Sequence, residues 1–328
     1  MKITGLKICC LLLLLPGILP AQPQTYPDHF IVSQDGSGDF KTIQEAVNAV
    51  RDLSQQQVTI YIKKGIYHEK LVIASWKTNI TLLGENRDSC IITNNDYTNK
   101  PYPGKDFSGR ATYMTFTSAT VLVQGNDCRI TNVTIENTAG RVGQAVALHV
   151  EGDRFAMANC NLLGNQDTLY TATEGSRQYY VNTYIEGTTD FIFGEATVIF
   201  QGCTIKSLSN SFITAASTRP GTKYGYVFFG CKLIADTAAK KVFLGRPWRP
   251  YAKTIFIRTE MGSHILPEGW DNWRNPENEK TVTYAEYKST GPGADVSRRV
   301  KWSRQLTAKE VKQYTLKNIF NGWKPEIQ

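Results

Sequence analysis

A short motif recurs along this chain and constrains its fold more than any other feature. Five cysteines each open a Cys-x-Ile/Leu triplet, usually just after a turn residue. The triplets begin at Cys90, Cys128, Cys160, Cys203 and Cys231, and Thr183 takes the same place in one further copy. From Cys128 onward the intervals are 32, 23, 20 and 28 residues. Such an irregular period lies in the range of a solenoid coil.

Between the triplets lie short β-rich runs broken by Gly and Asn. The gaps are too short and too glycine-rich for the crossover helices that join parallel strands in an open sheet. Two antiparallel sheets in a sandwich stay possible, but a ladder of like residues favours a right-handed parallel β-helix, in which each position stacks on its equivalent in the next coil. The expected strands are 58–62, 79–83, 120–124, 130–135, 145–150, 178–185, 197–200 and 224–229.

The two ends of the chain predict short capping helices. Residues 42–53 place Ile43, Val47 and Val50 on one helical face. Near the other end, Thr307 to Glu310 forms a capping box, and we expect it to open a second helix. No linker indicates a further domain, so we expect one β-helix domain over 22–328.

The ladder places the cysteines inside the solenoid as small apolar residues. Neighbouring rungs lie about 4.8 Å apart, which sterically permits a Cys128–Cys160 or a Cys203–Cys231 disulfide, and the sequence does not choose between these and free thiols. No Cys-x-x-Cys pair occurs, and the histidines are far from the cysteines in sequence, which argues against a structural zinc site.

Residues 1–21 have the pattern of a secretory signal peptide, with a basic start, an apolar run and Ala21 as the cleavage point. The apolar run is too short to span a bilayer. We therefore expect a secreted or periplasmic protein without a membrane span. The net charge of +8 is compatible with a polyanionic partner, but export and the lack of an arginine-rich stripe argue against nucleic acid.

Two aspartates stand in unusual settings. Asp167 lies in Gly-Asn-Gln-Asp-Thr-Leu-Tyr, and Asp190 lies in Gly-Thr-Thr-Asp-Phe-Ile-Phe-Gly. Carboxylates among apolar strand residues must be paired or must shift their pKa. Two of them one structural repeat apart form a natural pair of general acid and nucleophile.

Further polar and aromatic residues fit a site on one outer face of the solenoid. Gln144 opens an apolar strand, and 244–251 reads Leu-Gly-Arg-Pro-Trp-Arg-Pro-Tyr, which is too polar and too bent for a core strand. A tryptophan beside arginine suits a sugar that carries a carboxylate. Each signal alone has a structural alternative: Gln144 as a strand amide, Asp167 as a turn acceptor, and Asp190 with Arg246 as a structural ion pair.

Together these segments resemble the pectin methylesterases, a family of parallel β-helix carbohydrate esterases. The resemblance extends over nearly the whole chain after residue 21. It departs from the family at Arg141, which stands near a basic position but not on it, at Asn165, and in a longer loop at 171–176. The motifs that carry it are 35–43, 115–120, 144–148, 166–170, 190–194, 244–248 and 267–270.

The resemblance implies a role for each matching residue. Asp190 would be the nucleophile, held by Arg246, and Asp167 the general acid and later base. Gln144 and Gln166 would stabilise the oxyanion. Substrate contacts would come from Thr115, Gln144, Tyr170, Phe193, Arg246 and Trp248. The implied reaction is hydrolysis of the C6 methyl esters of galacturonate in pectin, with no metal or cofactor, by a monomer.

Two other function classes remain. A pectate lyase would need clustered acids that bind calcium and a basic residue that abstracts a proton, and the sequence has no such acid cluster. A β-helix that only binds glycan, or that hydrolyses another ester, would keep the fold and change the substrate. Methanol release with and without a chelator separates these alternatives.

Overall fold

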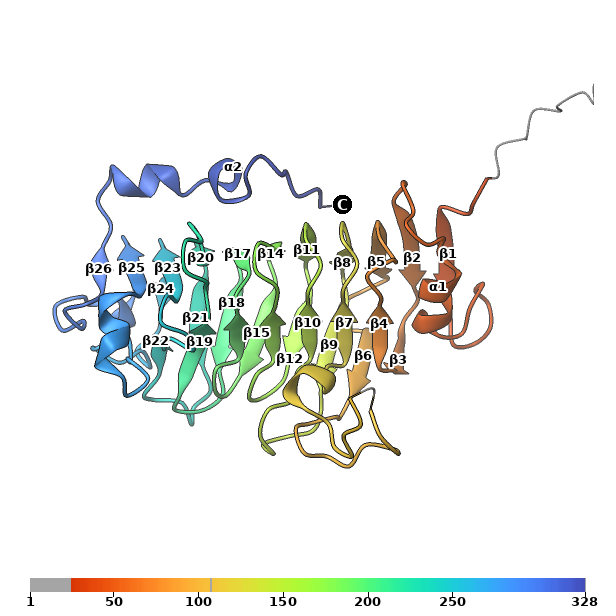
Figure 1. Cartoon of the computed structure of the whole chain (residues 1–328), viewed down its shortest axis with the longest axis horizontal. Helices are drawn as coiled ribbons and strands as arrows, with labels where there is room; N and C mark the ends of the chain where they lie inside the picture. The colour runs from red at the N-terminus through yellow and green to blue at the C-terminus, as the bar shows by residue number, and fades with distance from the viewer. Residues whose placement is uncertain (1–24, 107, 328) are drawn as a thin grey trace, which may run out of the picture.

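The computed structural model describes residues 25–106 and 108–327. They form three parallel sheets, and most coils of the chain contribute one strand to each (Figure 1). Sheet A contains β1 (His29–Val32), β2 (Val58–Ile62), β5 (Ile80–Gly84), β8 (Arg129–Thr131), β11 (Phe155–Ala158), β14 (Arg177–Val181), β17 (Thr197–Gln201), β20 (Tyr226–Phe229), β23 (Lys253–Ile257), β25 (Thr283–Tyr287) and β26 (Arg304–Gln305).

The other two sheets are formed by the strands that lie between successive strands of sheet A. Sheet B contains β3 (Gly65–His68), β6 (Cys90–Asn94), β9 (Thr134–Asn137), β12 (Asn161–Leu163), β15 (Tyr184–Gly187), β18 (Thr204–Ser207), β21 (Lys232–Ala235) and β24 (Glu260–Met261). Sheet C contains β4 (Leu71–Ile73), β7 (Val121–Val123), β10 (Leu148–Val150), β13 (Leu169–Thr171), β16 (Ile192–Gly194), β19 (Phe212–Ala216) and β22 (Phe243–Gly245).

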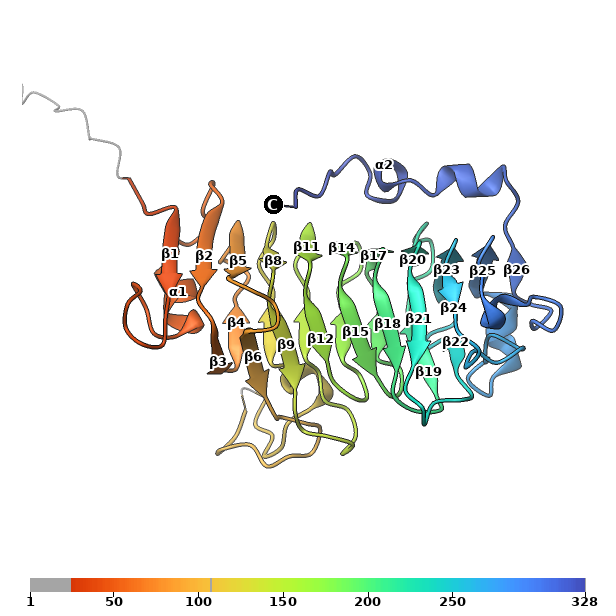
Figure 2. The same ribbon diagram turned by 180° about the vertical axis from the view of Figure 1, so that it is seen from behind.

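The chain visits the three sheets in a fixed order, and this order makes the solenoid. From β8 it passes to β9, β10 and then β11, which pairs in parallel with β8 one coil earlier. The same order repeats along the long axis, as the view from behind also shows (Figure 2). The expected parallel β-helix is confirmed.

Stacking of like residues fills the interior. Phe200, Phe228 and Phe256 lie on successive strands of sheet A, with ring centroids 4.4 Å apart at each step. All three rings are fully buried. Burial of each contributes about 1.5–3 kcal/mol relative to exposure, so this ladder is one of the main contacts between the C-terminal coils.

The turn between sheets A and B explains the repeat in the sequence. From β8 to β25, one residue with positive φ follows each sheet A strand, as at Asn159 (φ 52°) and Gly202 (φ 61°). The residue after it lies just before a sheet B strand, and there Cys160, Thr183, Cys203 and Cys231 point inward. They stack in one ladder with Cys90, the first residue of β6. Cys128 was assigned to this ladder wrongly: it precedes β8 of sheet A. All five thiols are buried and free.

Two of the expected strands contain such a turn. Residues 130–135 divide into β8 and β9 at Asn132 (φ 56°), and residues 178–185 divide into β14 and β15 at Asn182 (φ 48°). Asparagine tolerates this left-handed conformation. A single residue therefore turns the chain where the sequence indicated a continuous strand.

The N-terminal cap is confirmed and the C-terminal one is different. Helix α1 (Ile43–Ala49) begins at Thr42 with a complete capping box and packs on β1, β2 and β4. At the other end the Thr307–Glu310 box is present, but it opens only a 3₁₀ turn (Glu310–Gln313), followed by α2 (Leu316–Ile319). This segment runs back along the outer face of sheet A and does not close the solenoid (Figure 1).

Irregular segments connect the strands of the solenoid. The longest joins β6 to β7, contains a 3₁₀ turn at Thr115–Thr117, and projects from the coils (Figure 2). Further 3₁₀ turns lie at Pro276–Lys280 and Pro292–Ala294. Residues 1–21, the expected signal peptide, lie outside the described residues. Within the described chain no helix has the length and apolar character to cross a bilayer.

Candidate active site

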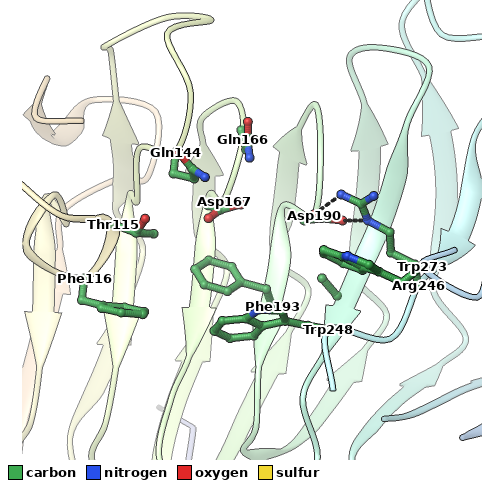
Figure 3. A pocket seen from close by; sticks show the side chains of 11 residues that line it. Thr115, Phe116, Gln144, Gln166, Asp167, Asp190, Phe193, Arg246, Trp248 and Trp273 are labelled. Carbon is green, nitrogen blue, oxygen red and sulfur yellow. Dashed lines mark hydrogen bonds and ion pairs between the residues drawn. The ribbon is translucent and has the colours of Figure 1, made fainter. Parts of the chain in front are cut away.

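A hollow of about 320 Å³ lies on the outer side of sheet C, where side chains from several coils converge (Figure 3). All the site residues predicted from the sequence line it, except Tyr170, which lies beside it. Its lining consists of Thr115, Phe116, Gln144, Gln166, Asp167, Asp190, Phe193, Ala215, Arg246, Trp248 and Trp273.

The two aspartates occupy equivalent places on successive coils. Asp167 precedes β13 and Asp190 precedes β16, and the backbone amide of Asp167 donates to the carbonyl of Thr189 at 3.1 Å. Rungs of a β-sheet lie about 4.8 Å apart, so the fold holds both carboxyl groups close together. Both residues have positive φ, 66° at Asp167 and 49° at Asp190. Strained backbone of this kind concentrates at functional sites.

Arg246 fixes one of the two carboxylates. Its Nε lies 3.0 Å from Oδ1 of Asp190, and Nη2 lies 2.7 Å from Oδ2, a bidentate ion pair. The guanidinium is held between two aromatic faces, with Cζ 3.9 Å from the ring centre of Phe212 and 3.7 Å from that of Trp273. Asp190 therefore has one fixed orientation in the hollow.

Asp167 has no such partner. No hydrogen bond from its side chain is found within the described residues, although the residue is only 8% exposed. Burial, and then the charge of Asp190, raise the pKa of Asp167 from 3.8 to about 8, against the opposing effect of Arg246. The carboxyl group is therefore protonated at neutral pH and can donate a proton.

The pKa of Asp190 departs less than that of Asp167. Burial raises it, and the hydrogen bonds and charge of Arg246 oppose that rise. Arg246 alone would lower the pKa of Asp190, but the loss of solvation on burial outweighs it. The bidentate geometry requires an ionised carboxylate. One proton donor and one carboxylate thus lie side by side. Two carboxyl groups whose environments push their pKa values apart are typical of an acid and a base or nucleophile in one active site.

Two amides stand at the rim above the aspartates. Gln144 forms a parallel bridge with Gln166 on the next coil, and the amide of Ala145 donates to the carbonyl of Gln166 at 3.1 Å. Both side chains lie near Asp167 (Figure 3), and within the described residues neither side-chain amide makes a hydrogen bond. They are free to donate to an oxygen bound in the hollow.

Aromatic rings form the floor of the site. Tyr170 stacks on Phe193 with ring centroids 4.5 Å apart, and Trp248 meets Phe193 edge-on at 5.8 Å. Phe116 approaches Tyr170 at 5.3 Å, while the Thr115 hydroxyl lies 3.0 Å from that of Thr98. Flat apolar faces beside hydrogen-bonding groups are suited to pyranose rings.

The sequence analysis missed Trp273, Phe212 and Phe116. Trp273 follows Trp270 by three residues in an irregular loop and has positive φ, and this tryptophan pair was the signal available. Phe212 begins a strand and gave no sign of facing an arginine. Arg141, which stands near a basic position of the family, donates to the carbonyl of Leu208 and does not line the hollow.

Comparison with known proteins agrees with this geometry. The family model described as Pectinesterase matches residues 29–323. The chain belongs to the pectinesterase family. It is 38% identical to pectinesterase 31 of Arabidopsis thaliana over 85% of this chain and 88% of that one. With pectinesterase 2 of Citrus sinensis it shares 38% identity over 92% of this chain and 60% of that one.

Solved structures of pectin methylesterases share the fold of this pectinesterase. The carrot enzyme superposes with a TM-score of 0.82 at 34% identity, over 92% of this chain and 95% of that one. The enzyme from Erwinia chrysanthemi gives a TM-score of 0.78 at 30% identity, over 93% and 100%. A pectin methylesterase mutant in complex with a hexasaccharide gives 0.79 at 30% identity, over the same shares.

Proposed function

We propose that this pectinesterase hydrolyses the C6 methyl esters of galacturonate units in pectin through an acyl-enzyme on Asp190. The observation that carries the proposal is the pair of buried carboxyl groups on successive coils, of which Arg246 binds only Asp190. Family membership and the hexasaccharide complex of a similar enzyme support the substrate.

The first half of the reaction forms the acyl-enzyme. An oxygen of Asp190 attacks the ester carbonyl carbon, and the carbonyl oxygen takes the negative charge. The amides of Gln144 and Gln166 donate hydrogen bonds to that oxygen. Asp167 gives its proton to the leaving methoxy oxygen, so that methanol departs and an anhydride joins the galacturonate carbonyl to Asp190.

The second half returns the enzyme to its starting state. Asp167, now a carboxylate, takes a proton from a water molecule as that water attacks the anhydride carbonyl. The bond to Asp190 breaks, galacturonate leaves as a free acid, and Asp167 holds its proton again. Arg246 keeps Asp190 oriented in both halves, and Phe193 and Trp248 hold the sugar ring over it.

The test is methanol release from highly methyl-esterified pectin, with and without a chelator. We expect methanol from the wild type in both conditions and none from Asp190→Ala or Asp167→Asn, with unchanged circular dichroism. Wild-type rates in Asp190→Ala would refute the assignment. If the folded wild type released no methanol, the site would belong to a glycan-binding β-helix or to an esterase for another substrate.

We also propose that the protein acts outside the cytoplasm, because residues 1–21 have the sequence of a signal peptide. We further propose that it acts as a monomer. Size-exclusion chromatography with light scattering, and N-terminal sequencing of exported protein, test the two parts separately. A dimer in the first experiment, or an intact N-terminus in the second, would contradict them.

A further inference from the structure

The guanidinium that orients Asp190 lies between two aromatic rings that are supported in different ways. Phe212 belongs to β19 and stacks on Phe243 of β22, with ring centroids 5.3 Å apart. The solenoid therefore fixes this ring. Trp273 covers the other face of Arg246 at 3.7 Å, but it comes from the irregular loop that follows β24. Its position depends on contacts within that loop.

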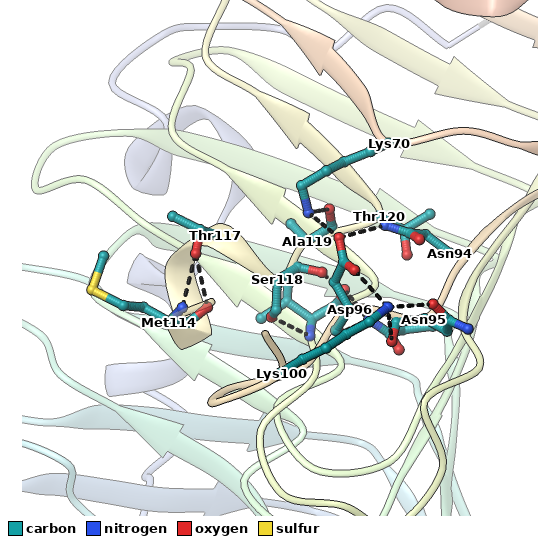
Figure 4. A network of polar contacts seen from close by, with 12 residues as sticks. Lys70, Asn94, Asn95, Asp96, Lys100, Met114, Thr117, Ser118, Ala119 and Thr120 are labelled. Atoms are coloured by element: carbon teal, nitrogen blue, oxygen red, sulfur yellow. Dashed lines mark hydrogen bonds and ion pairs between the residues drawn. The ribbon is translucent and has the colours of Figure 1, made fainter. Parts of the chain in front are cut away.

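The other end of the hollow, at Phe116, has a buried anchor. There the segment between β6 and β7 carries Asp96, which accepts hydrogen bonds from Lys70 and Lys100 at 2.9 Å each (Figure 4). Asp96 is only 5% exposed. In the described part of the chain, no ion pair involves residues 270–275, so Trp273 must be held by a smaller contact.

Asp271 makes the contact that fixes Trp273. Its Oδ1 accepts a hydrogen bond from the backbone amide of Trp273 at 2.7 Å, as in an Asx turn. Trp273 and Arg274 both have positive φ, 59° and 56°. Two bulky residues in succession rarely adopt this conformation unless a contact compensates for its cost. The carboxylate of Asp271 stabilises the turn that brings the indole over Arg246.

The backbone of Asp271 is joined to the coil that carries Arg246. Gly245 forms a parallel bridge with Trp270, and the amide of Asp271 donates to the carbonyl of Gly245 at 3.1 Å. This register places Asp271 beside Arg246, one coil further along sheet C. No ion pair joins their two side chains among the residues that the structure describes. Asp271 therefore contacts the guanidinium through Trp273 and not directly.

We propose that Asp271 is a positioning residue for the esterase reaction: through Trp273 it holds Arg246, and with it the Asp190 carboxylate, in the orientation for attack. The proposal rests on the proposed function and extends it to a residue that does not line the hollow. Attack requires a carboxylate oxygen at a set distance and direction from the ester carbon, and small displacements lower the rate steeply. A loosened guanidinium would let Asp190 turn away from that direction.

The first test is Asp271→Ala, which removes the acceptor and frees the turn at Trp273. We expect kcat for methanol release to fall about tenfold, with circular dichroism and melting temperature near those of the wild type. The loss should not be larger, because Phe212 still covers one face of Arg246. KM should change less than kcat, because the sugar contact at Trp248 remains.

Asp271→Asn is the matched conservative variant. Asparagine keeps an acceptor oxygen for the amide of Trp273 and lacks the charge, as alanine does. The comparison of the two variants therefore isolates the hydrogen bond. We expect Asp271→Asn to restore most of the kcat that Asp271→Ala loses.

The acid side of the kcat/KM profile gives a second readout. Burial raises the pKa of Asp190, Arg246 opposes that rise, and the charge of Asp271 adds to it. Both variants lack this charge, and the other ionisable groups near Asp190, which are Asp167 and Tyr284, are the same in both. Only Asp271→Ala loosens the guanidinium, so its acid limb should lie at higher pH than that of Asp271→Asn.

A double variant tests whether Asp271 acts through Trp273. Trp273→Ala should lower kcat at least as far as Asp271→Ala does, and the two substitutions together should lower it no further than Trp273→Ala alone. Asp236→Ala is the matched control. Asp236 accepts the amide of Ala238 at 3.1 Å in the same kind of turn, but it follows β21 of sheet B and does not line the hollow. Its loss should leave kcat unchanged.

Wild-type kcat in Asp271→Ala, an equal loss in Asp271→Asn, the same acid limb in both, or losses that add in the double variant would each overturn the proposal. Wild-type kcat in a folded Trp273→Ala would also overturn it, and this result does not depend on the folding of Asp271→Ala. Methanol release by the wild type in the same assay separates these outcomes from failure of the proposed function.

Discussion

Replacing Asp167 by asparagine should abolish activity and stabilise the fold. In the folded protein this carboxyl group has a pKa of about 8, against an ordinary value of 3.8. Between these values the folded chain keeps a proton that the unfolded chain has lost. The unfolded state binds fewer protons, so the free energy of unfolding falls as pH rises from about 4 to about 8. Asparagine has nearly the same shape and no proton to lose.

The size of the effect follows from the shift in pKa. Each unit corresponds to about 1.4 kcal/mol, and roughly three units separate the ordinary pKa from neutral pH, which sets an upper limit of about 4 kcal/mol. We expect Asp167→Asn to raise the free energy of unfolding by about 2–4 kcal/mol at neutral pH, since asparagine must still bury an amide. Near pH 4 the difference should approach zero.

Urea denaturation at a series of pH values measures this difference directly. The matched control is Asp88→Asn, which removes a carboxylate whose side chain is 71% exposed and should shift stability little at any pH. A difference between Asp167→Asn and the wild type that did not vary with pH would refute the reasoning. A variant that is less stable than the wild type at neutral pH would also refute it. That result would mean that ionising the buried carboxyl group costs the folded protein no free energy.

Three further outcomes follow from the site. On the alkaline side, kcat/KM should fall with a pKa of about 8 as Asp167 loses its proton. On the acid side it should fall as Asp190 gains a proton, at a pH above the ordinary pKa of 3.8. A flat profile between about pH 6 and pH 10 would contradict this. Arg246→Lys should lower kcat about a hundredfold, because lysine cannot make the bidentate pair or fill the space between the rings of Phe212 and Trp273. Methanol release assayed at fixed times measures this loss. Trp248→Ala should raise KM about tenfold with kcat nearly unchanged, the scale of one lost stacking face; an unchanged KM would remove Trp248 from the sugar site.

The repeat was readable from the sequence because a solenoid places equivalent residues in equivalent environments. Cys160, Cys203 and Cys231 directly precede sheet B strands, point inward, and follow a residue with positive φ. Cys128 has the same local pattern, including Asp127 with φ 59° before it, but it directly precedes a sheet A strand. The local turn is the same on both sheets, so sequence alone could not separate them.

The path of the C-terminal segment depended on packing that a local pattern does not contain. Its apolar stripe could cover the end of the solenoid or the outer face of a sheet. The outer face of sheet A is apolar at Tyr179, Ile199, Val227 and Ile255, each next to an inward apolar residue. Consecutive apolar residues in a strand indicate burial on both faces, and this was the available signal.

The sequence predicted the main residues of the site but not the walls of the hollow. The aspartates, glutamines and Arg246 carry their own motifs, and a solenoid brings such motifs to one face. Trp273 reaches Arg246 from an irregular loop, and its place depends on how that loop folds back. The hollow beside Phe116 likewise requires the segment between β6 and β7 to pack as it does around Asp96. Neither arrangement has a periodic pattern in the sequence.

The order of the coils gives the two aspartates their different roles. A solenoid that repeats an acid at one rung position must bring like charges to within about one strand spacing, so that only one can be ionised at low cost. The coils beyond Asp190 supply Arg246, while the coil before Asp167 supplies the uncharged Gln144. The cation therefore stabilises the charge on Asp190 and leaves the proton on Asp167. The two aspartates have the same backbone setting, since each has positive φ and lies just before a sheet C strand. Their neighbours along the solenoid axis therefore decide which one is the nucleophile and which one the acid.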